Sequence, residues 1–116
     1  MSHHLIAHVE IPATDVERSK KFFEAVFGWD LKEFGNGYLL CNSRQGTTIG
    51  VRKVKEVTHG DSPVFHILVD DIEDTTKLIK NNGGSIFKDK TVIPVYGWYA
   101  VIQDPDGNKI GLYEAH

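Results

Sequence analysis

The sequence predicts an α+β fold in which one βαβββ module occurs twice in a single chain. Residues repeat at an offset of 56 (71 − 15), which places Asp15 on Asp71. A later stretch repeats at an offset of 61 (111 − 50), which places Gly50 on Gly111. The two offsets differ by five residues, so the second copy contains about one extra loop before Trp98.

The length of 116 residues is enough for one domain with its own core. We therefore expect a single domain over 1–116, with module one at about 4–54 and module two at about 63–114. The polar segment 55–62 is expected to link the two modules.

Composition excludes several classes of function. The net charge of −3 and the lack of a basic stripe argue against nucleic-acid binding. No apolar run approaches the roughly 20 residues needed to span a bilayer, and the N-terminus does not resemble a signal peptide. The single cysteine, Cys41, fits a reducing compartment. We expect a cytoplasmic protein that binds neither nucleic acid nor membrane.

Module one opens with an aliphatic run over 5–11 that predicts a strand, and the Pro-Ala pair at 12–13 is expected to end it. Thr14 and Glu17 then fit a capping box at the start of a helix. Gly28 suits the left-handed residue that ends such a helix.

Three short strands should complete this module. They are expected at 29–34, 37–42 and 47–54. Asn36-Gly37 is a strong hairpin signal between the first two strands, and a turn over 43–46 separates the second from the third.

Module two repeats this order. A strand is expected over 64–69, and a helix capped by Asp70 should end at 81–84. The remaining strands are expected at 85–92, 98–103 and 108–114. The Asp-Pro-Asp-Gly sequence at 104–107 is typical of a tight turn.

Four stretches carry a specific family pattern: 12–19, 23–29, 69–72 and 104–108. With the duplicated βαβββ order, they make the chain resemble the vicinal oxygen chelate superfamily of glyoxalase I, bleomycin-resistance proteins and extradiol dioxygenases. The runs 93–98 and 110–114 are similar to a subgroup of uncharacterised proteins related to lactoylglutathione lyase. The resemblance implies a half-open, eight-stranded, barrel-like cleft with two helices outside.

In metal-using members of that superfamily, four positions hold one divalent ion. The resemblance places them at His8, Gly50, Val64 and Gly111. One ligand in four cannot hold a catalytic ion, so we expect no cofactor and no metal-dependent glyoxalase or dioxygenase activity. Whether another reaction is catalysed stays open.

A displaced metal site is the alternative. Glu10 follows His8 by two residues and shares its strand face, and His66 is the repeat equivalent of Glu10. These three side chains could hold an ion, although a hydrogen-bonded polar group is the favoured interpretation. The other histidines are expected to be solvated: His3, His4, His59 and His116.

A ligand-binding cleft remains the main hypothesis. Its candidate residues are His8, Glu10, His66, Gly50, Val64, Trp98 and Gly111. The two glycines are expected to leave room for a ligand, and Trp98 either lines the cleft or packs the sheet edge. Tyr38 and Tyr99 also lie nearby, and Tyr99 is expected to have a scaffold role. Three cations are expected at the surface, or could draw an anionic ligand: Arg44, Arg52 and Lys53.

The favoured function is metal-free binding of a small organic molecule, in the manner of bleomycin-resistance proteins. One alternative is a lyase- or dioxygenase-type enzyme that uses either the displaced metal or acid–base chemistry at His8 and Glu10. For His8, a hydrogen-bonded remnant of the ligand set is favoured over a general base. The other alternative is a dimerising structural domain, and the resemblance implies a homodimer.

Overall fold

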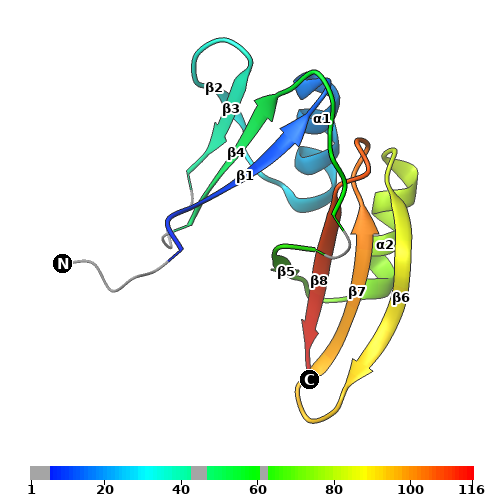
Figure 1. Cartoon of the computed structure of the whole chain (residues 1–116). Coiled ribbons are helices and arrows are strands. Elements are labelled where there is room, and N and C mark those ends of the chain that lie inside the picture. Colours follow the sequence, from blue (N-terminus) through cyan, green and yellow to red (C-terminus); the bar gives the residue numbers. More distant parts are fainter. Residues whose placement is uncertain (1–5, 43–46, 61–62) are drawn as a thin grey trace, which may run out of the picture. The chain divides into compact units, whose positions relative to one another are not determined.

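The computed structural model of the protein describes residues 6–42, 47–60 and 63–116. The chain forms two compact units, residues 1–57 and 58–116, and the boundary falls within the expected linker (Figure 1). Several predictions lie outside the described residues: the start of the first strand, the turn at 43–46, and His3, His4 and Arg44.

Unit 1 contains one helix and one mixed sheet. Its elements are β1 (His8–Ala13), α1 (Val16–Phe27), β2 (Lys32–Glu33), β3 (Tyr38–Cys41) and β4 (Thr48–Lys53). The strand order is β1-β4-β3-β2. β1 runs parallel to β4, whereas the other neighbours are antiparallel.

Unit 2 has the same connectivity. Its elements are β5 (His66–Leu68), α2 (Ile72–Asn81), β6 (Ser85–Ile93), β7 (Gly97–Gln103) and β8 (Lys109–Ala115). The order β5-β8-β7-β6 again places the first strand parallel to the last. The predicted duplication of a βαβββ module is therefore confirmed.

Each sheet has a helix side and an open face, because successive strand residues point to opposite sides. In unit 1 the helix side carries the core, including Ile11, Leu39 and Val51, against the buried Phe22 and Phe23 of α1. The core of unit 2 is built in the same way from Ile72, Ile79, Ala100, Ile102, Ile110 and Leu112. The helix side of each sheet therefore carries most of the packed core.

Both helix starts lie one residue later than predicted. Asp15, not Thr14, is the N-cap of α1, and its carboxylate accepts from the Arg18 backbone N–H at 3.1 Å. Asp71, not Asp70, caps α2. Glu17 is thereby the second helical residue rather than the third, so the predicted capping box does not form.

The first strand also continues beyond its predicted end, through Pro12 to Ala13. β1 is an edge strand, where the missing N–H of proline is tolerated. The helix end at Gly28 is confirmed, with φ of 70°. No helix in the described part of the chain is long and apolar enough to cross a membrane.

Candidate functional site

A chain of hydrogen bonds crosses the open face of the unit 1 sheet. The Tyr38 hydroxyl on β3 donates to Glu10 Oε2 on β1 at 3.0 Å, and lies 2.8 Å from His8 Nε2. Thr48 Oγ1 on β4 contacts His8 Nδ1 at 2.6 Å. The Arg52 Nε–H donates to Glu10 Oε1 at 2.8 Å and forms an ion pair with it. These five residues form the open-face network: His8, Glu10, Tyr38, Thr48 and Arg52.

Proton positions in the network follow from its donors. Because the Tyr38 O–H is used on Glu10, the Tyr38 oxygen accepts from the Nε2–H of His8. Nδ1, the other ring nitrogen of His8, is in contact with the Thr48 hydroxyl. Both imidazole nitrogens are therefore engaged, and Tyr38 lies between His8 and Glu10.

The pKa values of two members of the network, Glu10 and Tyr38, are shifted. The hydrogen bond from Arg52 is the main reason that the pKa of Glu10 lies below its usual value. Partial burial, followed by the hydrogen bond to Glu10, raises the pKa of Tyr38. At neutral pH the network therefore holds a carboxylate, a guanidinium and a protonated phenol.

Gly50 lies directly beneath this network. A Cβ at this position would collide with the Tyr38 hydroxyl and would come within 2.9 Å of His8 Nε2. The sequence-based expectation that Gly50 leaves room for a ligand is therefore wrong. Its missing side chain makes room for Tyr38 instead.

Unit 2 repeats this packing with a different side chain. Glu10 pairs with Gly50 and His66 pairs with Gly111, so the predicted equivalence of Glu10 and His66 is confirmed. A Cβ at Gly111 would lie 2.5 Å from His66 Cγ. The second glycine is thus also covered, here by an imidazole from the neighbouring strand. Val64 precedes β5 and is 93% exposed.

Trp98 does not share a sheet face with Gly111. Trp98 pairs with Glu114 on β8. The Glu114 carboxylate accepts a hydrogen bond from the backbone N–H of Ile72, the first residue of α2, at 2.8 Å. Both side chains therefore lie on the helix side of the sheet. Lys90 Nζ lies 4.7 Å from the centre of the Trp98 ring, and the His116 ring lies 5.5 Å from it. The structure therefore supports the packing alternative for Trp98. Tyr99, one residue on, faces the open side.

His59 and His116 are exposed but have protein partners, contrary to the expectation that they are simply solvated. His59 Nε2 contacts the Asp106 carbonyl at 2.7 Å. This contact braces the predicted 104–107 turn. The turn also depends on Asp104, which is buried and accepts three hydrogen bonds.

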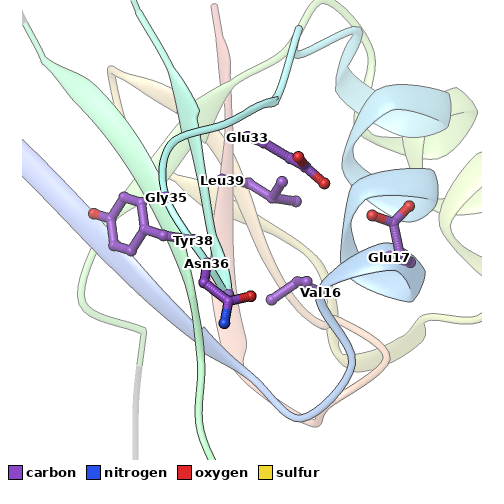
Figure 2. A pocket seen from close by; sticks show the side chains of 8 residues that line it. Val16, Glu17, Glu33, Gly35, Asn36, Tyr38 and Leu39 are labelled. Carbon is purple, nitrogen blue, oxygen red and sulfur yellow. The ribbon is translucent and has the colours of Figure 1, made fainter.

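Two hollows flank the β2–β3 hairpin of unit 1. The helix-side hollow, about 390 Å³, is acidic, with the carboxylates of Glu17 and Glu33 at its rim (Figure 2). Figure 2 shows the Tyr38 ring directed away from it. The open-face hollow, about 300 Å³, is lined by Asp30, Lys32, Glu33, Phe34, Leu40 and Asn42. Leu40 pairs with Gly50, so this second hollow borders the open-face network.

Sequence reasoning missed Thr48, and for Arg52 it favoured a surface charge over a group that draws an anionic ligand. The signal was present, because both lie two residues from Gly50 and period-2 alternation puts all three on one face. Parallel pairing then brings Thr48 opposite His8. Lys53, the other described cation of this group, lies on the opposite face.

The described residues contain no group of three His, Cys, Asp or Glu side chains that could hold a metal ion. His8 and Glu10 lie in unit 1 and His66 lies in unit 2. The alternative metal set of these three residues, like the cleft expected to unite them, stays a prediction.

Comparisons with known proteins agree with this architecture. Residues 5–112 match the family model described as the Glyoxalase/Bleomycin resistance protein/Dioxygenase superfamily. A glyoxylase-like domain-containing protein of Didymella fabae is 33% identical, over 91% of this chain and 90% of its own length. A putative glyoxylase of Mycobacterium tuberculosis, CFP32, is 25% identical over 93% of this chain, which spans 44% of that protein.

Solved structures show the same fold. A glyoxalase/bleomycin resistance protein from Albidiferax ferrireducens T118 superposes with a TM-score of 0.78 at 24% identity, over 96% of this chain and 98% of that one. TnmS3 from Streptomyces sp. CB03234, described as an antibiotic binding protein, gives a TM-score of 0.71 at 21% identity, over 100% and 99%.

Proposed function

The chain belongs to the glyoxalase/bleomycin resistance protein/dioxygenase superfamily, and we propose that it binds a small organic molecule without a catalytic metal. The observation that carries this proposal is the open-face network over Gly50. In metal-using relatives the position of Gly50 supplies a metal ligand. Here the Tyr38 hydroxyl fills the space over Gly50, and this hydroxyl is already hydrogen-bonded to Glu10.

The donor set in unit 1 does not fit a divalent ion. His8 offers no free nitrogen, since Tyr38 and Thr48 occupy both. Glu10 is paired with the Arg52 guanidinium, and a fixed cation at this distance repels a second one. Gly50 offers no ligand at all. Binding by hydrogen bonds and apolar contact is therefore the chemistry that these residues support.

The open-face hollow supports the binding of an organic molecule. Its volume of about 300 Å³ lies at the lower end of the range for small-molecule sites. It places the apolar Leu40 and Phe34 beside the polar network, and such a mixture fixes both the body and the orientation of a ligand. The description of TnmS3 indicates that this fold can serve such a role.

Metal analysis and a ligand screen test this function together. Protein purified without chelators or a metal-affinity column should contain no stoichiometric transition metal by mass spectrometry, because a bound ion requires several converging ligands. A library of small aromatic, anionic and neutral compounds should include some that raise the melting temperature. A stoichiometric ion that is lost in His8→Ala would overturn the proposal.

An acid–base enzyme is a second candidate, favoured by the continuous path from His8 through Tyr38 to Glu10. Such a chain could move a proton across the open face. In that case Tyr38→Phe, which interrupts the path, should abolish turnover while compounds from the screen still bind. The implied homodimer stays a separate proposal, which sedimentation equilibrium tests directly.

A further inference from the structure

We propose that the ligand of the open face is an organic carboxylate with an apolar body, held by Arg52 and by the open-face hollow. This inference rests on the proposed metal-free binding and names the chemical class of the ligand. Its carboxylate would lie against the terminal amino groups of the Arg52 guanidinium. Its body would cover Phe34 and Leu40.

The Arg52 side chain is held in place through its Nε–H group, while its other donors face no recorded partner in the described residues. It lies on β4, between β1 and β3, and donates through Nε to Glu10 at 2.8 Å. Within the described residues, no hydrogen bond or ion pair is recorded for its two terminal amino groups, and the side chain is 55% exposed. A guanidinium held at Nε presents its remaining edge as a planar pair of donors, which matches the geometry of a carboxylate.

The network favours an acceptor-bearing ligand over a donor-bearing one. Each oxygen of Glu10 already accepts one hydrogen bond, from Arg52 or from Tyr38. The proton of the Tyr38 hydroxyl is used on Glu10, and both nitrogens of His8 are engaged. Arg52 thus has the strongest unused hydrogen-bonding groups of the network, and these are donors.

The apolar part of the site lies beside Tyr38, which pairs with Arg52 across β3 and β4. Phe34 is 67% exposed, and its ring stands at 67° to the Tyr38 ring with centroids 6.3 Å apart. Leu40 borders the same hollow. A ring-sized apolar group placed here would remove exposed aromatic surface from water, which favours binding.

The acidic residues of the hollow do not oppose an anion strongly. Asp30 forms an ion pair with Lys32 at 3.5 Å. Glu33 lines both hollows. It pairs with Leu39, and its carboxylate is directed to the helix side of the sheet, where Glu17 also lies (Figure 2).

Calorimetry with two matched pairs of probes tests the inference: benzoate with benzamide, and phenylacetate with phenylacetamide. Each carboxylate should bind at least about tenfold more tightly than its amide, as expected when one charge-assisted pair is gained. Arg52→Gln should remove this preference. Arg52→Lys should retain only part of it, because lysine lacks the planar pair of donors that matches a carboxylate. Phe34→Ala should weaken both members of each pair about equally.

Lys53→Gln is the matched control, since it removes the same charge from the next residue of β4 on the opposite face. It should leave all four affinities unchanged, and circular dichroism should show that every variant is folded. Equal binding of acids and amides, or unchanged binding in Arg52→Gln, would overturn the carboxylate assignment and leave metal-free binding intact. If no probe binds while the wider screen finds other ligands, the carboxylate class is wrong; if the wider screen is also negative, both proposals fall.

Discussion

The Tyr38 hydroxyl lies over Gly50, although the register places Tyr38 directly opposite Arg52. The ring therefore leans two residues along β4 and fills the space that any larger residue at position 50 would need. This one displacement brings Tyr38 to both His8 and Glu10 and turns separate side chains into a network.

Gly50→Ala should be destabilising because the added methyl group would force the Tyr38 ring and His8 to move. Overpacking of this kind costs about 1–3 kcal/mol, measurable as the free energy of unfolding in urea. The same substitution in a Tyr38→Ala background should cost much less, because the obstructing ring is gone. Additive effects of the two substitutions would contradict the close packing that the structure shows.

The contribution of Glu10 to stability should depend on pH. The pKa of Glu10 in the folded protein lies below its ordinary value of 4.5, mainly because of Arg52. A lowered folded pKa adds stability above the unfolded pKa, and this stability is lost as the pH falls through the folded pKa. Glu10→Gln should therefore reduce the free energy of unfolding at pH 7 by about 0.2–1 kcal/mol, the range for an exposed pair.

Chemical denaturation at pH 7 and at pH 3 checks this expectation. The difference between the parent protein and Glu10→Gln should shrink at the lower pH. Glu56→Gln is the control, because Glu56 is exposed and no partner for it is recorded in the described residues. If the stability difference between the parent protein and Glu10→Gln grew on acidification, the lowered pKa of Glu10 in the folded protein would be contradicted.

The architecture was predictable because it depends on patterns that repeat along the chain. Two copies with alternating strands and glycine at the helix ends predicted the order of helices and strands in each module. They also predicted that Glu10 and His66 occupy equivalent positions, which the register confirms. The helix starts were displaced by one residue because two potential caps stand side by side in each copy. In the first copy the capping-box pattern of Thr14 and Glu17 was preferred, although Asp is the better N-cap residue type.

The candidate site was only partly predictable. Which residues share a sheet face follows from alternation, and this would have found Thr48 and Arg52. The lean of Tyr38 onto Gly50 depends on a side-chain rotamer and on the space left by a neighbouring strand. For Trp98 the sequence analysis left cleft lining and edge packing open, because the insertion before Trp98 was considered and the alternation of side chains along β7 was not.

Asp104 should be the most sensitive residue of the turn at 104–107. It is 3% exposed and accepts from the backbone N–H groups of Asp106 and Asn108, and from the Asn108 side chain, each at 2.9 Å. Asp104→Ala would leave these donors without their acceptor, which costs about 1–3 kcal/mol. Thermal unfolding should show a clear loss, whereas Asp70→Ala, at an exposed site, should change stability by less than about 0.5 kcal/mol. Equal melting temperatures for the two variants would remove the structural role given to Asp104.

Trp98→Ala should weaken unit 2 without altering ligand binding at the open face of unit 1. The indole packs beside Lys90 and His116 on the helix side, so its removal should cost about 1–3 kcal/mol, less than for a fully buried tryptophan. Tyr96→Ala supplies the control, because Tyr96 is an exposed aromatic residue at the adjoining hairpin tip. Denaturant unfolding measures the first effect, and calorimetry with benzoate measures the second. A stable Trp98→Ala protein that no longer bound the carboxylate would restore Trp98 to the ligand site.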